Sequence, residues 1–158
     1  MVCGREKLTD LNLAHMRLIS FFFLLNILLL SSCGKDNNPV PDVQVNFKAS
    51  LAAELPRLTQ PGGVELVDKI AGGANGVAGL VLYNKNGVYL AFDRCSTVNP
   101  EKLCAVTWQE GWGALVKDPC SGAYFDLSVG AAASSAPAEK SLRQYTVIVE
   151  GNYIRVVN

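Results

Sequence analysis

Short alternating or apolar stretches, separated by turns rich in Gly and Pro, run from about residue 43 to the end of the chain. The stretch "VQVNFKA", 43–49, alternates apolar and polar side chains, which is the period of a half-buried strand. A second short strand is predicted at "VELVDK", 64–69. Between them, "ELPRLTQPGG", 54–63, contains two prolines and two glycines and predicts a loop.

Three later segments each predict a β-hairpin. In the first, 80–83 and 88–92 flank the turn "NKNG". In the second, 105–108 and 114–117 flank "QEGWG", and the third, 143–158, turns at "EGN". The stretch 129–142 has no clear period and predicts irregular structure. Because no convincing amphipathic helix follows residue 33, the pattern predicts an all-β sandwich or barrel of antiparallel strands.

The N-terminal block has a different pattern. Met16 and Arg17 precede a 13-residue stretch, 18–30, that is apolar except for Ser20 and Asn26. A bilayer-spanning helix needs about 20 apolar residues, so this stretch suits the core of a signal peptide better. Residues 1–15 contain Glu6 and do not fit the start of a signal peptide. We therefore expect translation to start at Met16; an unusually long leader is the alternative.

The signal core ends on "LLSSC", 29–33, which resembles a bacterial lipobox. The resemblance implies cleavage before Cys33 and acylation of its sulfur; a signal peptide cut elsewhere, with Cys33 an ordinary thiol, is the alternative. We expect residues 1–32 to be removed, 33–44 to be a lipidated, poorly packed tether, and 45–158 to be the β domain. The expected location is the cell envelope, lipid-anchored to a membrane and facing the periplasm or the surface.

Removing residues 1–32 changes the available chemistry. From Cys33 onward the chain has 126 residues, with 11 Lys and Arg against 12 Asp and Glu, a net charge of −1. This balance does not suggest a nucleic-acid surface. The only histidine of the sequence is His15, so the mature chain has none. Its unlipidated cysteines are Cys95, Cys104 and Cys120, and no Ser-His or Cys-His nucleophile is available.

Three later pieces occur in a meaningful order: "AFDRC", 91–95, "DPCSGAYFDL", 118–127, and "APAEKSLRQY", 136–145. Together they resemble the Rieske domain over residues 77–158. The stretch "VPDVQVNFKASL", 40–51, is similar to the lead-in of small Rieske-like lipoproteins of Bacteroidetes-type bacteria. The resemblance implies a Rieske-like antiparallel β-sandwich or barrel. In that family a Cys-x-His loop and a Cys-x-x-His loop hold a [2Fe–2S] cluster, and a Gly-Pro-Ala-type loop covers it.

The resemblance places the four cluster-ligand positions on Cys95, Thr97, Asp118 and Ser121. Only the first keeps its ligand, because a Rieske cluster is held by two Cys and two His. Hydroxyl groups are hard ligands and poor replacements for imidazole on iron. An all-Cys cluster needs four thiolates, and the mature chain has at most three. We therefore expect neither a [2Fe–2S] cluster nor another metal, and we expect Asp118 to accept hydrogen bonds from nearby backbone N–H groups.

The cover loop of the family corresponds to Ala136, Pro137 and Ala138. Ala136 stands where the family has glycine, and Pro137 still stiffens the turn. We expect this loop to cap the apolar rim of the other two loops; a docking surface for a partner is the alternative.

We expect the lipoprotein to fold outside the cytoplasm, where disulfides between its cysteines persist. Some Rieske domains have a disulfide between the two cluster loops, and the resemblance places it at Cys104 and Cys120, leaving Cys95 free. The nine-residue separation between Cys95 and Cys104 is longer than usual, so Cys95–Cys120 stays the second choice. Closing the loop from 104 to 120 would contribute about 3 kcal/mol to stability.

The function that follows is a membrane-anchored Rieske-like lipoprotein that has lost its cluster and is non-catalytic. An electron-transfer protein is what the resemblance alone would imply. Further alternatives are an envelope module that binds an unknown protein partner at the former cluster end, and a thiol-redox lipoprotein. The last would use Cys95 with its pKa lowered by Arg94.

Overall fold

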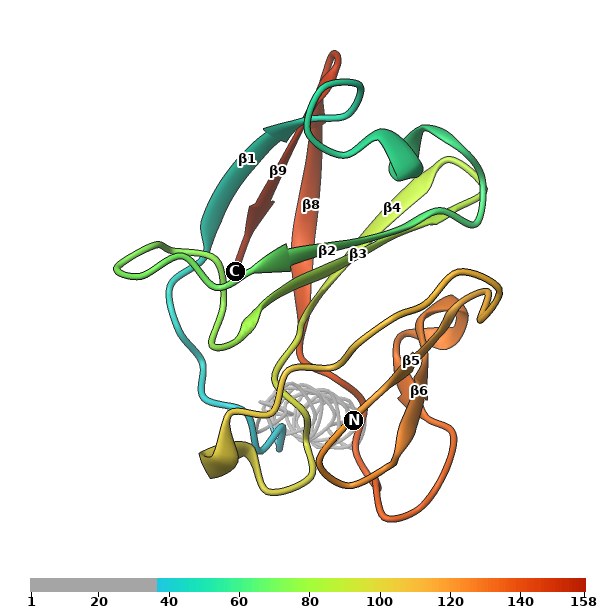
Figure 1. Cartoon of the computed structure of the whole chain (residues 1–158). Coiled ribbons are helices and arrows are strands. Elements are labelled where there is room, and N and C mark those ends of the chain that lie inside the picture. Colours follow the sequence, from blue (N-terminus) through green and yellow to red (C-terminus); the bar gives the residue numbers. More distant parts are fainter. Residues whose placement is uncertain (1–36) are drawn as a thin grey trace, which may run out of the picture. The chain divides into compact units, whose positions relative to one another are not determined.

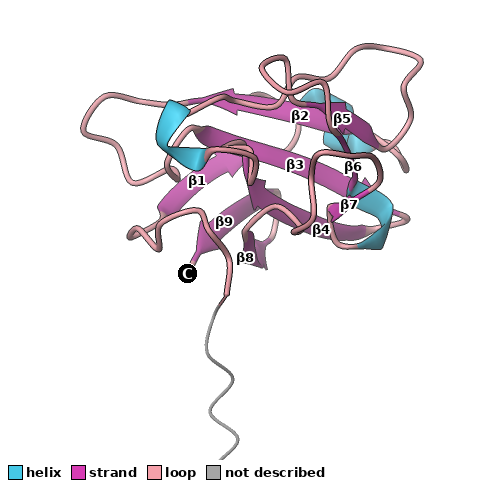
Figure 2. Cartoon of the chain, turned by 90° about the horizontal axis from the view of Figure 1, so that it is seen from below, coloured by secondary structure: helices cyan, strands magenta, loops and turns pink. Residues whose placement is uncertain are grey.

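This computed structural model describes residues 37–158, which contain nine strands and three short 3₁₀ helices. Six strands form an antiparallel sheet in the order β1-β9-β8-β4-β3-β2, and three form a smaller sheet, β5-β6-β7 (Figures 1 and 2). The expected all-β antiparallel class is confirmed. Within this range no helix is long and apolar enough to cross a membrane.

The larger sheet contains β1 (Asn46–Ser50), β2 (Val64–Asp68), β3 (Gly79–Lys85), β4 (Val88–Asp93), β8 (Gln144–Glu150) and β9 (Tyr153–Val157). The smaller sheet contains β5 (Leu115–Lys117), β6 (Tyr124–Asp126) and β7 (Ala132–Ala133). The 3₁₀ helices are η1 (Pro56–Thr59), η2 (Pro100–Lys102) and η3 (Leu127–Val129).

The first and third hairpins form as the sequence predicts. Strands β3 and β4 join through Asn86 and Gly87, with φ of 51° and 92°. Two successive positive φ angles are what a two-residue type I′ turn requires, and Asn-Gly is its favoured sequence. Strands β8 and β9 turn at Gly151, where φ is 63°. Turn chemistry therefore fixes the register of both hairpins.

The larger sheet bends sharply between β4 and β8. Only two residue pairs join these strands, Ala91 with Tyr145 and Phe92 with Gln144, whereas five pairs join β8 to β9. Beyond this short ladder β8, β9 and β1 turn away from β2, β3 and β4 (Figure 1). The result is a curled sheet rather than a flat one.

The alternation along β3 sends side chains into two apolar clusters. Leu80 and Leu82 face one side, and Val81 and Tyr83 face the other. The first cluster lies among β1, β8 and β9, and includes Val45, Ala49, Leu51, Leu55, Leu58, Ala91, Tyr145, Ile154 and Val156. The second lies towards the smaller sheet, and includes Val64, Phe92, Val106, Val116, Ala123, Phe125, Leu127, Ala131 and Leu142.

The second predicted hairpin forms only in part. Residues 105–108 and 114–117 pair antiparallel at a single bridge between Thr107 and Lys117, and the extended ladder of β5 is with β6. The cause is competition for backbone groups, because Ala105 bridges to Cys95 and the Val106 N–H donates to the Arg94 carbonyl at 2.7 Å. The stretch 129–142, predicted as irregular, contains the two residues of β7.

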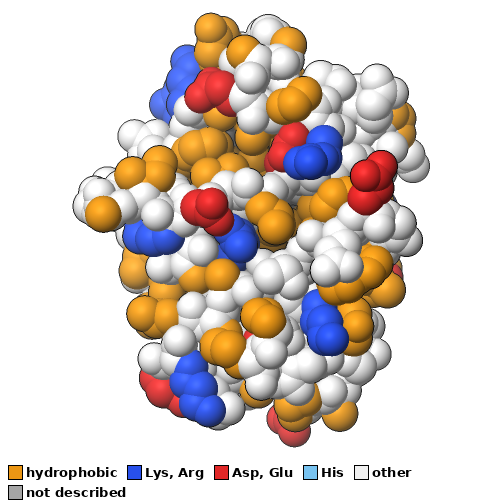
Figure 3. Space-filling view, viewed as in Figure 1, with side chains coloured by type: hydrophobic (Ala, Val, Ile, Leu, Met, Phe, Trp, Pro, Cys, Tyr) orange, Lys and Arg blue, Asp and Glu red, His pale blue; other side chains and the backbone are white. Residues whose placement is uncertain are grey.

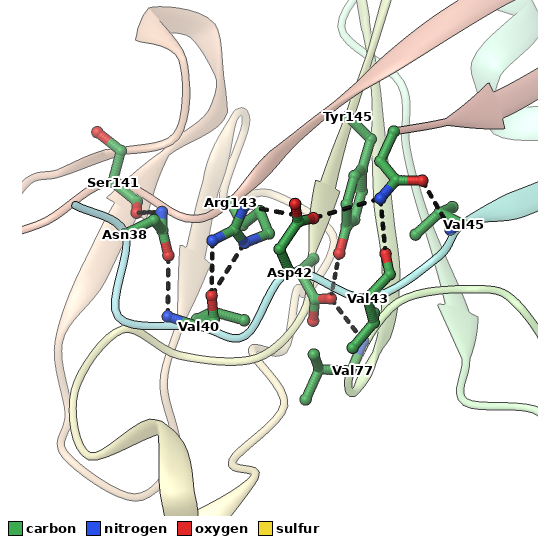
Figure 4. Close-up of polar contacts among 11 residues, drawn as sticks. Asn38, Val40, Asp42, Val43, Val45, Val77, Ser141, Arg143 and Tyr145 are labelled. Carbon is green, nitrogen blue, oxygen red and sulfur yellow. Dashed lines mark hydrogen bonds and ion pairs between the residues drawn. The ribbon is translucent and has the colours of Figure 1, made fainter. Parts of the chain in front are cut away.

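The expected tether is packed from Asn38 onward, contrary to its predicted loose character. We name residues 38–45 the strap. Val40 is fully buried against Ala78 and Cys95, and the Arg143 guanidinium donates to the Val40 carbonyl from Nε at 3.0 Å and Nη2 at 2.7 Å (Figure 4). Between residue 37 and the start of the alternating stretch at residue 43, Val40 is the one buried apolar side chain, and a single such residue produces no period that could show the packing. The predicted signal peptide and Cys33 lie outside the described residues.

Candidate functional site

Three loops meet at one end of the domain, and we call this the loop end: residues 95–104, 118–123 and 134–141. The first loop follows β4, the second joins β5 to β6, and the third precedes β8 (Figure 1). A disulfide joins Cys104 to Cys120, with the two Cα atoms 6.3 Å apart, and Cys95 is the free cysteine of residues 37–158. This is the pairing that the resemblance favours over Cys95–Cys120.

Asp118 is the centre of the hydrogen bonds between the first two loops. Its carboxylate is fully buried. Oδ2 accepts from the Ser96 hydroxyl at 2.7 Å and from the Ser121 hydroxyl at 2.5 Å, while Oδ1 accepts from the Cys120 N–H at 2.8 Å. The last contact agrees with the expectation that Asp118 accepts from nearby backbone. The contact with Ser96 was not expected, and it makes Asp118 a link between loops.

The two serines that bind Asp118 also satisfy their own loops. The Ser96 hydroxyl accepts from the Val98 N–H at 3.1 Å, and the Ser121 hydroxyl accepts from the Ala123 N–H at 3.2 Å. Each serine hydroxyl therefore accepts a hydrogen bond from a backbone N–H of its own loop and donates one to the shared carboxylate. Such connected networks are more stable when every member is satisfied.

These contacts determine the charge state of Asp118. Burial alone would raise its pKa, but hydrogen bonds from the Ser121 and Ser96 hydroxyls and from backbone N–H groups of the second loop outweigh burial. The net effect is a pKa below the ordinary value of 3.8. Asp118 is therefore ionised at neutral pH, and its negative charge is stabilised by donors from both loops.

Thr97 connects the first loop to the third. Its hydroxyl donates to the Lys140 carbonyl at 2.7 Å. In the cover loop, Ala136 and Pro137 are exposed and joined by a cis peptide bond, while Ala138 packs partly against the second apolar cluster. The loop end is thus held by one disulfide and by the side chains of Thr97 and Asp118, with the apolar contact of Ala138.

Cys95 is buried and chemically quiet. Its N–H donates to Asp93 Oδ1 at 2.7 Å, and its sulfur lies 3.6 Å from the Pro100 carbonyl oxygen. Burial, and then the negative charges of Asp93, Asp118 and Glu101, raise the pKa of the thiol to about 11. Since the thiolate is the nucleophile, Cys95 is largely unreactive at neutral pH.

The expectation that Arg94 lowers the pKa of Cys95 is wrong. The Arg94 guanidinium instead forms an ion pair with Asp68 at 2.5 Å and donates from Nε to the Val106 carbonyl at 3.2 Å. Its charge is therefore paired on the β2 side. The premise of a thiol-redox function is not met by this arrangement.

Asp93 is a buried residue whose role the sequence reasoning missed. It accepts hydrogen bonds from four donors: the N–H groups of Val77, Ala78 and Cys95, and the Tyr145 hydroxyl at 2.8 Å. Burial and the Asp93 charge raise the pKa of Tyr145. The only signal in the sequence is an acidic residue directly after the apolar run "YLAF".

The donor set at the loop end does not fit a [2Fe–2S] cluster. A Rieske cluster needs two thiolates and two imidazoles, and the corresponding positions offer one buried thiol, two hydroxyls and a carboxylate. Potential ligand atoms of Cys104, Asp118 and Cys120 lie within 4.8 Å of one another. Two of these are the bonded sulfurs of the disulfide, and the carboxylate oxygens already accept from Ser96, Ser121 and Cys120.

No family model and no curated protein matches this chain. Solved structures do match its chain path. One is titled as the complex of reduced oxygenase and oxidized ferredoxin in carbazole 1,9a-dioxygenase: 22% identity, 72% of this chain and 94% of that chain covered, TM-score 0.47. A second is the ferredoxin of carbazole 1,9a-dioxygenase from Nocardioides aromaticivorans IC177, with 19% identity, 73% of this chain and 98% of that chain covered, and a TM-score of 0.46. A third is the Sphingomonas yanoikuyae B1 ferredoxin, with 21% identity, 65% of this chain and 93% of that chain covered, and a TM-score of 0.46. At these values the likeness assigns no activity to this chain.

Proposed function

We propose that this chain is a membrane-anchored, Rieske-like lipoprotein that has lost its [2Fe–2S] cluster and acts without catalysis. The observation that carries the proposal is the position of Asp118. It stands where the resemblance places a cluster-ligating Cys, and its carboxylate binds Ser96 of the facing loop and Ser121 of its own. A hydrogen-bonded link between the loops takes the place of an iron-based one.

The other ligand positions support the same proposal. Thr97 uses its hydroxyl to hold the Lys140 carbonyl, Ser121 uses its hydroxyl on Asp118, and Cys95 is packed with Val40 and Ala78. Each residue has a local structural partner that a metal ligand would have to give up. An electron-transfer function needs a redox centre, and this set of side chains supplies no substitute for one.

The membrane anchor is proposed from the sequence. An apolar stretch too short to span a bilayer ends directly on "LLSSC", which gives Cys33 the context of a lipidated cysteine. Replacing Cys33 with Ala should abolish labelling of the protein by a radioactive fatty acid in cells. Continued labelling would contradict the anchor, while leaving the proposal about the cluster standing.

Iron analysis tests the central claim. The purified mature protein, isolated and then incubated anaerobically with ferric iron and sulfide, should stay colourless and carry no stoichiometric iron or sulfide. A visible absorption band with stoichiometric iron and sulfide would overturn the proposal in favour of an electron-transfer protein.

A matched variant tests the Rieske-like assignment itself. The triple substitution Thr97→His, Asp118→Cys and Ser121→His would restore two Cys and two His at the four positions. We expect this variant, but not the parent, to gain a visible band after the same incubation. If the variant folds, judged by circular dichroism, and still gains no band, then the four positions do not form the frame of a cluster.

A further inference from the structure

The chain enters the domain beside the loop end. Asn38 Nδ2 donates to the Ser141 carbonyl at 3.1 Å, and Val40 is buried against Cys95, the first residue of the first loop (Figure 4). Arg143, just before β8, then holds the Val40 carbonyl. The strap therefore starts next to the first and third loops and is fixed there by both polar and apolar contacts.

In the sequence, the proposed anchor comes shortly before this entry point. Cys33 and Asn38 are five residues apart in the sequence, and five extended residues span at most about 18 Å. Strand β8 starts near the loop end and runs to Glu150, a length of about 20 Å. The β8–β9 turn therefore lies at the opposite end of the domain (Figure 1). A short link at one end restricts which end can lie near the bilayer.

The loop end exposes an apolar side chain with basic neighbours. Leu103 is 58% exposed and has a φ of 53°, a left-handed conformation that a leucine rarely adopts. Its N–H donates to the Pro100 carbonyl, and the next residue, Cys104, is bonded to Cys120, so the backbone here is held on both sides. Lys102 and Lys140 are exposed in the first and third loops.

These side chains suit the interface of a bilayer. Long lysine side chains place apolar stems on a surface while their ammonium groups reach phosphate headgroups. Glu101 and Glu139 are also exposed and offset the charge of the lysines. On the face drawn in Figure 3, hydrophobic and charged side chains of the described residues are interspersed, without one dominant charge. The short link, rather than a strong charge, would therefore set the orientation.

We infer that the loop end faces the bilayer surface, with Leu103 directed towards the headgroup region. The inference rests on the proposed lipid anchor at Cys33. Its consequence is that the former cluster end is turned towards the membrane, and the β8–β9 turn is turned towards the aqueous compartment. A soluble partner would then have access to the latter end more readily than to the former.

Energy transfer from single labels tests this orientation. The lipidated protein is placed in vesicles of phosphatidylcholine and phosphatidylglycerol that contain a headgroup-linked acceptor dye. A donor dye is attached at Lys140→Cys, in the loop end, or at Ala52→Cys, which is exposed beside the β8–β9 turn. Cys95 is buried and the other two cysteines are bonded, so the introduced thiol is the accessible one. We expect at least about twofold greater transfer from position 140, given the separation of about 20 Å along β8.

Three further variants identify the cause of the difference. Inserting about 20 Gly and Ser residues between Asn37 and Asn38 should remove it, because a long flexible link imposes no orientation. Leu103→Ser should reduce transfer from position 140, whereas Val88→Ser, at a similarly exposed valine that begins β4, should not.

The outcomes separate the two proposals. Protein that does not float with the vesicles overturns the anchor, and with it the orientation. Protein that floats but transfers equally from positions 140 and 52, or more from 52, overturns the orientation alone. A difference that persists after insertion of the long link supports the orientation, but it shows that contacts of the loop end with the bilayer, rather than the short link, set it.

Discussion

Two neighbouring regions each contain one fully buried carboxylate, but one carboxylate connects strands and the other connects loops. Asp93, at the end of β4, accepts hydrogen bonds from the two residues just before β3, from the first loop and from β8. Asp118 collects donors from the first and second loops alone. The first carboxylate joins strands of the larger sheet, and the second joins loops where the resemblance expects a cluster. Loss of a cluster would therefore leave Asp118, but not Asp93, to hold together loops that the cluster had held.

The largest effect should come from removing the carboxylate that belongs to the sheet. Asp93→Ala leaves three backbone N–H groups and the Tyr145 hydroxyl without their acceptor in a buried place. We expect the free energy of unfolding to fall by about 4 kcal/mol, since each buried donor left unsatisfied is costly. Urea unfolding measures this, with Glu110→Ala as an exposed control expected to change stability by less than about 0.5 kcal/mol. A loss no larger than that of the control would show that Asp93 does not organise the sheet end.

Removing the disulfide should weaken the loop region by a smaller amount. The double variant Cys104→Ser and Cys120→Ser should lose about 3 kcal/mol, the loop-closure value for a bridge of this span. Cys95→Ala keeps the bridge and is the matched control in the same unfolding assay. Thiol counting under denaturing conditions, in protein carrying Cys33→Ser, should give one free thiol. Three free thiols would rule the bridge out.

Asp118 should show a smaller cost that depends on pH. Its pKa is lowered in the folded protein, so its contribution to stability is present above its unfolded pKa and is lost as pH falls through the folded value. We expect Asp118→Asn to cost about 2 kcal/mol at pH 7, and clearly less once the pH falls below 3.8. Urea unfolding of the parent and of Asp118→Asn, at pH 7 and at a pH below 3.8, measures this cost. Glu110→Gln is the exposed control in the same assay. An equal cost at both pH values would show that the charge of Asp118 does not stabilise the loops.

The smallest effect concerns Cys95, whose pKa both carboxylates raise. Its alkylation in the native protein should be slow at neutral pH and should still be rising above pH 9, because the pKa of the thiol is about 11. Asp118→Asn removes one of the raising charges and should move this profile to lower pH, unlike Glu110→Gln. A rate that levels off near pH 8 would revive the thiol-redox alternative.

The larger sheet was predictable because its strands are long enough to show a period. The alternation in β1, the apolar run of β3 and the Asn-Gly turn before β4 are local signals. The two-residue β7 and the single Thr107–Lys117 bridge are too short for any period, and their pairing depends on which backbone groups the first loop leaves available.

The candidate site was predictable only in part. The four ligand positions came from resemblance, and the sequence indicated the residue types that stand there. Three of the site's contacts join residues far apart in the chain. They are the hydrogen bonds from Ser96 to Asp118, from Thr97 to the Lys140 carbonyl and from Tyr145 to Asp93. Such contacts depend on how the sheet curls, which no local pattern specifies.

The strap changes where this domain begins as a transferable unit. A recombinant fragment started at Val45, the predicted start of the β domain, would lose Val40 and its carbonyl, which accepts hydrogen bonds from the Arg143 guanidinium. It would also open the apolar contact over Cys95 and Ala78. Any fusion or truncation that gives this domain a new leader should therefore keep the chain from Asn38, because that segment packs as part of the domain.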